Sequence, residues 1–145
     1  YVRDPGNAGS VIRVADAAGA RGVITSTDSV DVHNPKVVRS SAGSLFHLPV
    51  VQEVDVFDII NKARECGLQV LAADGSGKSF DSGVELAKPT LWVFGNEAWG
   101  LPDEVLSAVE QVVSIPIYGK AESLNLATAT AVCLYASAFA QQFKN

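Results

Sequence analysis

The chain has 145 residues, of which 48% are hydrophobic and 19% charged, and its formal net charge is −5 at neutral pH. This length and composition predict one folded domain with a substantial core and exclude a disordered chain. The acidic balance argues against a broad nucleic-acid-binding surface but leaves room for a small basic site. Since the chain starts at Tyr1 and contains no methionine, we interpret it as part of a longer protein, and no signal peptide is visible.

In chain order, hydrophobic periodicity and turn residues predict a helix over about 11–18, a strand at 22–25, a short helix at 36–41, a strand at 50–51, a helix at 56–66, a strand at 68–72, a strand at 90–94, a short helix from 103, a strand at 112–115 and a final helix at 123–143. Asp55 can cap the helix at 56–66, and Gly67 can end it. Strands that alternate with helices predict an α/β fold, in which helices cover a parallel sheet.

The final helix is uncharged from residue 123 to 143 and is therefore expected to be buried nearly all round. It is long enough to cross a bilayer, but its many Ser, Thr, Asn, Gln and Ala residues favour a water-soluble domain and no membrane contact. Cys66 and Cys133 lie far apart, and neither His33 nor His47 stands at ligand spacing from them. We expect two structural thiols in a reducing cytoplasm and no metal.

Residues 75–79, Gly-Ser-Gly-Lys-Ser, have the look of a phosphate-binding loop but fail its pattern. The phosphate-loop motif would need a glycine where Ala72 stands and a helix directly after Ser79. The dinucleotide fingerprint also fails, because Phe80 occupies the position of its third glycine. We therefore expect residues 74–88 to form a flexible surface loop, and neither a nucleoside triphosphate site nor a nicotinamide enzyme is favoured.

Polar residues and glycines gather in three segments that suit ligand binding. Asn7 and Gly9 stand at the entrance of the first helix, with Arg13 about one and a half turns further on. Residues 95–100, Gly-Asn-Glu-Ala-Trp-Gly, directly follow the clearest core strand, at the carboxyl end of the sheet where open α/β sheets bind ligands. Taken alone, each segment has an ordinary explanation: a cap at Asn7, a solvated Arg13, or a strand-to-helix turn.

The third segment, Ser123-Leu124-Asn125, opens the final helix and follows another strand end at Ile115-Pro116. Polar groups at a helix start beside a strand end form a natural ligand site. The ordinary explanation is that Ser123 caps the helix. We favour a functional role, because Asn125 suits an otherwise apolar helix poorly.

In this order, the three segments resemble the motifs of the SpoU (TrmH-like) branch of the SPOUT RNA methyltransferases, over essentially the whole chain. The matching residues are Asn7, Gly9 and Arg13 in the first motif, Gly95, Glu97 and Gly100 in the second, and Ile115, Pro116, Ser123, Leu124 and Asn125 in the third. Residues 34–46 are also similar to ribosomal-RNA members of this family, including thiostrepton-resistance-type ribose methyltransferases.

The resemblance implies a SPOUT-type fold, with a parallel sheet, helices on both faces and a C-terminal trefoil knot. It implies S-adenosylmethionine as the cofactor, bound bent in the knot by backbone groups of Gly95, Ile115 and Leu124. Other residues of the same segments complete the expected cofactor site: Asn96, Gly100, Pro116 and Ile117. A homodimer is also implied, with the apolar final helix at its interface.

The implied reaction is methyl transfer to a ribose 2′-hydroxyl of RNA, with ribosomal RNA favoured over transfer RNA. The expected catalytic residues are Arg13, Asn7, Glu97, Ser123 and Asn125. Arg13 would contact the hydroxyl, as a base or as a positioning group, and would be able to act across the dimer. Positioning is the safer hypothesis, because a guanidinium stays protonated at neutral pH and offers forked donors. A different class remains open: a non-catalytic RNA-binding or dimerisation module on the same fold.

RNA affinity is largely electrostatic, and the acidic charge of this chain departs from that need. Family members often carry a separate RNA-binding domain before the catalytic one. We therefore expect residues 1–145 to form the catalytic domain, with an N-terminal RNA-binding domain absent from this chain. A local basic patch on the catalytic domain would comprise Arg3, Arg13, Lys36 and Arg39.

Overall fold

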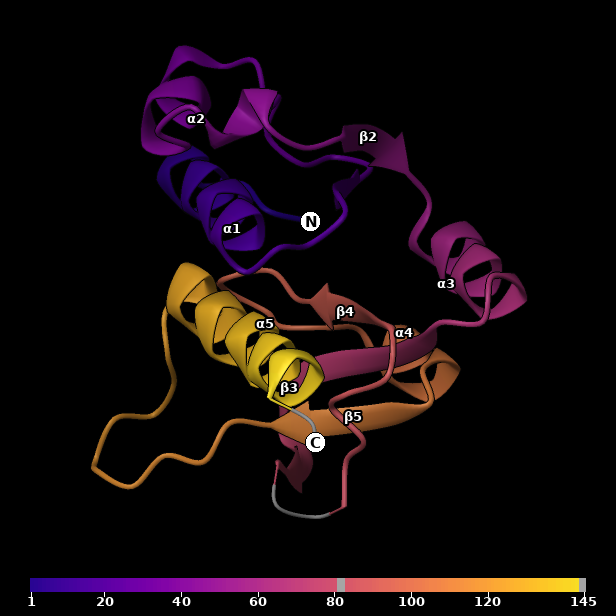
Figure 1. The fold of residues 1–145 in the computed structure, drawn as a ribbon. Coiled ribbons are helices and arrows are strands. Elements are labelled where there is room, and N and C mark those ends of the chain that lie inside the picture. The colour runs from indigo at the N-terminus through magenta and orange to yellow at the C-terminus, as the bar shows by residue number, and fades with distance from the viewer. Residues whose placement is uncertain (81–82, 144–145) are drawn as a thin grey trace.

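The computed structural model describes residues 1–80 and 83–143, in which helices alternate with strands (Figure 1). The elements are α1 (Pro5–Ala17), β1 (Val23–Ser26), α2 (Pro35–Ser40), the 3-10 helix η1 (Ser44–Phe46), β2 (Val50–Val54), α3 (Val56–Glu65), β3 (Gln69–Ser79), β4 (Thr90–Phe94), α4 (Asp103–Ala108), β5 (Gln111–Ser114) and α5 (Leu126–Gln142). The alternating order predicted from the sequence is confirmed.

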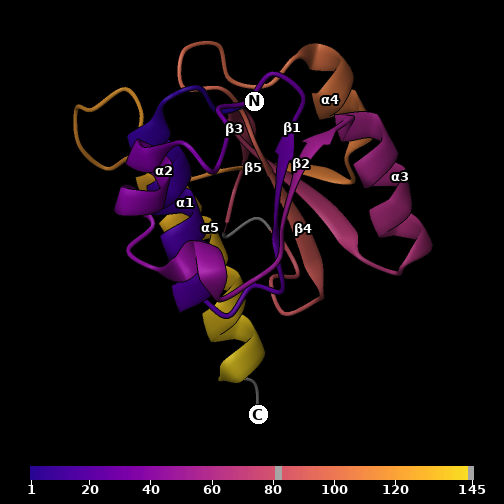
Figure 2. The same cartoon turned by 90° about the horizontal axis from the view of Figure 1, so that it is seen from above.

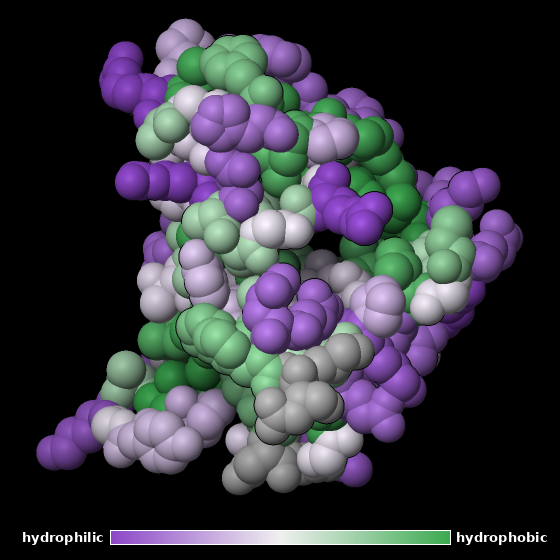
Figure 3. Space-filling view, viewed as in Figure 1, coloured by the Kyte–Doolittle hydropathy of each residue, from purple (hydrophilic) through white to green (hydrophobic). Residues whose placement is uncertain are grey.

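All strand pairs are parallel, as expected, but they form two sheets and not one. β1 pairs with β2, while β3 lies between β4 and β5 in the order β4-β3-β5. Within the described residues, no strand ladder joins the two sheets. The β1–β2 pair is irregular, since its register shifts between Ile24 and Ser26 and Glu53 has a positive φ of 59°. Figure 3 shows hydrophobic surface where β2 lies, in line with the exposed Ile24 and Val51.

Helices cover both sides of the strands. Figure 2 shows α1, α2 and α5 on one side and α3 and α4 on the other. One buried cluster lies among α3, α4, β3 and β4, and a second lies among α1, α2 and η1. The Trp92 indole N–H donates to Ser137 Oγ at 2.9 Å, which ties β4 to α5.

Asp4, and not Asn7, caps the first helix. The Asp4 carboxylate accepts a hydrogen bond from the Asn7 backbone N–H at 2.9 Å, and Pro5 occupies the first helical position, where no N–H is needed. The Asn7 side chain is therefore left free for other partners. The cap predicted for α3 is confirmed, because Asp55 accepts from Phe57 and Asp58, and Gly67 follows the helix with a φ of +81°.

The loop predicted from residue 74 begins later than expected, because β3 continues to Ser79, while the described residues 80 and 83–88 belong to no helix or strand. Asp74 accepts from the Ser76 backbone and hydroxyl, and the strand then rejoins β5, with Lys78 opposite Val113. A Cβ on Gly77 would lie 2.5 Å from the Val112 carbonyl oxygen, so only glycine allows this return. Residues 75–79 thus belong to a strand, and the next helix of the described residues begins only at Asp103, which excludes a phosphate loop.

The final helix is shorter and more exposed than the sequence predicts. It begins at Leu126, and Asn125 caps it by accepting from the N–H groups of Ala127 and Thr128. Only Thr130, Cys133 and Ser137 are buried among its described residues, and 53% of Phe139 is exposed. The expectation that α5 is buried all round is therefore wrong for one chain. No helix within residues 1–80 and 83–143 is long and apolar enough to cross a membrane.

The two cysteines differ in environment, and the structure contains no disulfide between them. Cys133 on α5 is fully buried, and this burial raises the pKa of its thiol to about 12. Cys66 is exposed at the end of α3. The structural role expected for both thiols thus fits the environment of Cys133 better than that of Cys66.

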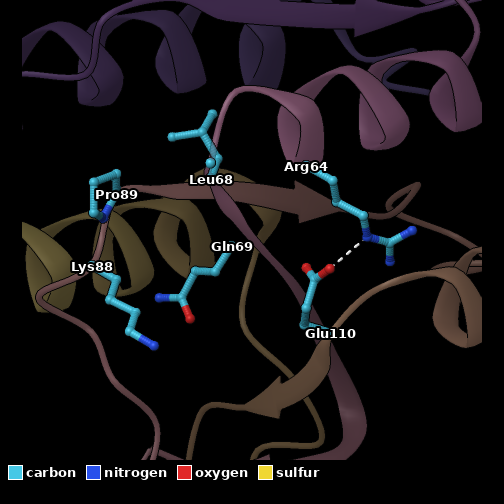
Figure 4. Close-up of a pocket in the computed structure, with 7 residues that line it drawn as sticks. Arg64, Leu68, Gln69, Lys88, Pro89 and Glu110 are labelled. Atoms are coloured by element: carbon cyan, nitrogen blue, oxygen red, sulfur yellow. Dashed lines mark hydrogen bonds and ion pairs between the residues drawn. The ribbon is translucent and has the colours of Figure 1, made fainter.

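A surface pocket lies at the amino ends of β3 and β4, opposite the strand ends to which the sequence motifs point (Figure 4). It is lined by Arg64, Gly67, Leu68, Gln69, Lys88, Pro89 and Glu110. The Glu110 carboxylate pairs with Arg64 and accepts the Val70 backbone N–H, while the Arg64 guanidinium also donates to the Ala108 carbonyl. These bonds brace α3 against β3 and the start of β5, so a structural role accounts for the charged groups.

Gly9 lies where α1 packs against α2, and its replacement by alanine is expected to destabilise the protein. A Cβ there would lie 2.7 Å from the Val37 carbonyl oxygen and closer still to Ser40 Oγ. Alanine favours a helix by about 0.5–1 kcal/mol over glycine, but overpacking costs about 1–3 kcal/mol. The free energy of unfolding of Gly9→Ala, measured by urea titration, should therefore be about 1–2 kcal/mol lower than that of wild type. Gly119→Ala is the control, since no atom lies within 4 Å of its Cβ position; a Gly9→Ala protein as stable as wild type would contradict this packing role.

The Glu110 brace should weaken in acid. Partial burial raises the pKa of Glu110, but hydrogen bonds from Arg64 and Val70 outweigh burial and hold the pKa below its ordinary value. A folded-state pKa below the unfolded-state pKa stabilises the protein above the unfolded value, and this contribution disappears as the pH falls through the folded value. The free energy of unfolding should therefore depend less steeply on acid pH in Glu110→Gln than in wild type.

Urea titrations between neutral and acid pH would measure this difference. Glu85→Gln is the matched control, because the Glu85 carboxylate pairs with Lys88 at the surface, three residues along the chain. It should keep the wild-type slope. Equal slopes for Glu110→Gln and wild type would show that the brace contributes nothing.

Candidate functional site

Three side chains from the three sequence motifs meet at one point. Asn125 Nδ2 donates to Asn7 Oδ1 at 3.1 Å, and Asn7 Nδ2 donates to Glu97 Oε1 at 3.4 Å. We call these residues the motif network. It joins the start of α1, the loop after β4 and the N-cap of α5, although its members are 90 and 118 residues apart from Asn7. The sequence-based prediction grouped these residues, and the structure brings them together.

The loop after β4, residues 95–100, is held by the side chain of Asn96. Its Oδ1 accepts from the N–H groups of Ala98 and Trp99, at 2.7 and 3.3 Å, and its Nδ2 donates to the Tyr1 carbonyl at 3.1 Å. The backbone groups of Asn96 bond reciprocally with those of Gly100. Every polar group of Asn96 thus has a partner within the protein, which gives this residue a role in shaping the loop.

Two glycines make this tight loop possible. A Cβ on Gly95 would lie 2.6 Å from the Gly100 carbonyl oxygen and 2.7 Å from the Leu101 nitrogen. Gly100 has a φ of +68°, a conformation that side chains with a Cβ rarely adopt. These glycines serve the closure of the loop, a role that the sequence pattern alone could not separate from backbone approach to a ligand.

The segment between β5 and α5 carries unpaired backbone groups. Ile115 and Pro116 are half-buried at the end of β5, whereas residues 117–123 are exposed and Leu124 is half-buried. Among the hydrogen bonds of the described residues, none involves a backbone group of residues 117–124. Figure 1 shows this segment as a loop that extends away from the rest of the molecule. Its free N–H and carbonyl groups are available to a ligand or to a second chain.

The structure does not bring every predicted residue into the motif network. Ser123 is exposed and makes no hydrogen bond in the part of the chain that the structure describes. Arg13 is exposed on α1 and has no ion pair or hydrogen bond to any described residue. Arg13 follows Asn7 by six residues, which places it about 120° away around the helix axis. Within one chain, Arg13 therefore faces away from the network.

The other expected basic residues lie on two different elements. Lys36 and Arg39 are exposed on α2, which packs against α1. Arg3 lies before α1, against the rings of Tyr1 and Trp99. The two aromatic residues were absent from the sequence-based site, although a tryptophan inside a glycine-containing loop after a core strand is a signal by which Trp99 could have been found.

A Ser–His–Asp cluster elsewhere on the chain lacks the geometry for nucleophilic catalysis. Ser44 Oγ donates to Asp16 Oδ2 at 2.8 Å, and His47 Nδ1 lies 2.7 Å from the same oxygen. These contacts with His47 and Ser44 hold the pKa of Asp16 below its ordinary value. Because Ser44 bonds to the carboxylate and not to the imidazole, no proton relay to the hydroxyl is set up. Among the described residues, no group of three or more His, Cys, Asp or Glu side chains could hold a metal ion.

Comparisons with known proteins identify the family of this chain. The SpoU rRNA methylase family model matches residues 1–135. A Streptomyces viridochromogenes 23S rRNA (uridine(2479)-2′-O)-methyltransferase is 42% identical over 137 residues, which cover 90% of this chain and 47% of that protein.

Two solved structures extend the comparison. The SpoU methyltransferase AviRb from S. viridochromogenes, in complex with AdoMet, has a TM-score of 0.86 at 38% identity, covering 94% of this chain and 56% of AviRb. An AdoMet-bound rRNA methyltransferase from Sinorhizobium meliloti has a TM-score of 0.87 at 39% identity, over 99% of this chain and 54% of its own. The chain spans about half the length of the curated relatives it matches. It therefore belongs to the SpoU rRNA methylase family.

Proposed function

We propose that this chain is the catalytic domain of an S-adenosylmethionine-dependent methyltransferase that acts on a ribose 2′-hydroxyl of ribosomal RNA. The observation that carries the proposal is the motif network, which joins Asn7, Glu97 and Asn125 through two hydrogen bonds. Relatives named as 23S rRNA 2′-O-methyltransferases support the same reaction and the same substrate class. An RNA-binding domain that precedes residues 1–145 in the full protein is part of the proposal.

The residues present fit the cofactor. S-adenosylmethionine is polar along its length and, when bound, supplies a methyl group activated by a sulfonium. The backbone groups of residues 117–124 have no partner among the described residues and adjoin the motif network through Asn125. We assign cofactor binding to Gly95, Ile115 and Leu124, with Gly100, Pro116 and Ile117 completing the walls. Asn96 shapes this site through the hydrogen bonds that hold its loop.

The chain's own polar side chains would hold the ribose. Asn7, Glu97, Ser123 and Asn125 offer amide, carboxylate and hydroxyl groups at the starts of α1 and α5 and in the loop after β4. Methyl transfer requires the 2′-hydroxyl to lose its proton and to approach the methyl group in line. Arg13 would position the nucleotide through its phosphate, since a protonated guanidinium donates hydrogen bonds and does not accept a proton.

A second copy of the chain would complete the site. Arg13 faces away from the network of its own chain, and α5 leaves apolar side chains exposed. We propose a homodimer with α5 at its interface, in which Arg13 of one chain serves the network of the other. The C-terminal trefoil knot, the cytoplasmic location and the RNA-contacting role of Arg3, Lys36 and Arg39 remain predictions from the family resemblance.

Arg13→Ala should abolish methyl transfer and leave cofactor affinity nearly unchanged. Calorimetry with S-adenosylmethionine should show about one saturable site per chain in wild type and variant. Transfer of radiolabelled methyl groups by the full-length protein to unmodified 23S ribosomal RNA, and in parallel to transfer RNA transcripts, measures activity and substrate class. Methyl transfer to transfer RNA alone would show that transfer RNA, and not ribosomal RNA, is the substrate. Cofactor binding without any methyl transfer would favour a non-catalytic module. Equal loss of binding and transfer would remove Arg13 from its assigned role.

Mixing inactive variants tests whether Arg13 acts across the dimer. A heterodimer of Arg13→Ala and Asn125→Ala chains contains one site with an intact Asn125 and an intact Arg13 from the partner. Activity should therefore reappear when the two variants are co-refolded. If both residues belong to the same chain's site, every site in the mixture is defective in one of them, and no activity returns.

A further inference from the structure

Two aromatic rings and a guanidinium gather next to the motif network, and the proposed function leaves the rings without a role. The ring centroids of Tyr1 and Trp99 are 6.3 Å apart. Arg3 Cζ lies 5.0 Å from the Tyr1 centroid and 5.8 Å from the Trp99 centroid. We call these three side chains the aromatic platform. Trp99 is 68% exposed, so a large planar surface faces solvent.

Asn96 holds both aromatic residues of the platform in place. Its Oδ1 accepts the Trp99 backbone N–H, and its Nδ2 donates to the Tyr1 carbonyl. Gly100 closes the loop behind Trp99 through its reciprocal bonds with Asn96. An exposed tryptophan on a loop fixed in this way is pre-organised, and a pre-organised group loses little conformational freedom on binding.

The platform lies beside the proposed ribose site. Glu97, which accepts from Asn7, precedes Trp99 by two residues in the same closed loop. A nucleotide whose ribose rests on the motif network would therefore have its own base, or a neighbouring one, close to these rings. Proteins that read single-stranded RNA stack unpaired bases on aromatic side chains and on arginine planes.

We propose that the aromatic platform stacks against an unpaired nucleobase of RNA and thereby positions the target nucleotide on the motif network. This inference rests on the proposed function. Arg3 and Glu97 carry opposite charges and the chain as a whole is acidic, so this place offers no cluster of positive charges for phosphates. Stacking carries the contact, which makes Trp99 a positioning residue for the reaction.

Tryptophan fluorescence can test the stacking directly. Titration of the wild-type chain with a twelve-nucleotide oligouridine should quench its emission, because a stacked base quenches an exposed indole. Trp99→Phe should keep the binding, measured by anisotropy of a labelled oligouridine, but lose the quenching. Trp99→Ala should weaken binding roughly five- to a hundredfold, the range expected for one lost stacking contact. Phe57→Ala is the control, since Phe57 is an exposed aromatic residue on α3 that does not belong to the platform.

An abasic oligomer of the same length separates stacking from phosphate attraction. The abasic oligomer should not quench the tryptophan emission. Its affinity for Trp99→Ala should equal its affinity for wild type. The proposal is overturned if the wild-type chain shows no quenching, if Trp99→Ala binds oligouridine as wild type does, or if the abasic oligomer binds as tightly as oligouridine.

Methyl transfer to 23S ribosomal RNA by the full-length protein gives the functional readout. Trp99→Ala should lower kcat/KM, Trp99→Phe should restore most of it, and both should bind S-adenosylmethionine as wild type does by calorimetry. Loss of cofactor affinity in Trp99→Ala would assign the ring to the cofactor site and overturn the proposal. Trp99-dependent binding of oligouridine, combined with no methyl transfer by the full-length wild-type protein, would support the platform and refute the proposed reaction, so the two failures are distinguishable.

Discussion

The hydrogen bonds that join Asn125 to Asn7 and Asn7 to Glu97 are the constraint on which the rest of the site depends. They tie together a helix start, a strand-end loop and a helix cap that are remote in sequence. An asparagine side chain suits this position, because its amide donates with one end and accepts with the other. Asp4 makes this possible, since it caps α1 and leaves the Asn7 side chain free. Because Asp4 is the N-cap of α1, the Asn7 side chain can bond to Glu97 and Asn125 instead of capping the helix.

Backbone shape, more than side-chain chemistry, prepares the loop beside this network. Gly95 and Gly100 allow the chain to fold back on itself, and Asn96 satisfies the polar groups that the turn would otherwise leave open. The same principle acts at Gly9, where the missing side chain admits α2. Glycines in these motifs therefore work through packing and loop closure, while the unpaired backbone groups lie in the segment that leads into α5.

Local signals in the sequence predicted most elements, and non-local contacts account for the errors. The strand at 90–94 was predicted with the bounds that β4 has, because it is a hydrophobic run between turn residues. β3 was predicted too short, since its return to the ladder depends on Gly77 meeting Val112 across the sheet. The hydrogen bonds of Asn7 to Glu97 and Asn125 could not be predicted from residue spacing, because they join residues far apart in the chain. Only the order of the three motifs, taken with the family resemblance, grouped these residues.

The mismatch at α5 bears on how the site is completed. An uncharged helix normally signals burial on all sides, yet Phe139 and Val132 are exposed in one chain, and Tyr135, Phe139 and Phe143 form a row of rings. The amino-acid composition of a helix reflects every surface that covers it, including the surface of a second chain at an interface. Arg13 presents the same discrepancy, as a motif residue without a partner among the described residues of its own chain. Since one cause, the proposed second copy of the chain, would account for both, the exposed helix and the unpaired arginine support each other as arguments for a site shared between two subunits.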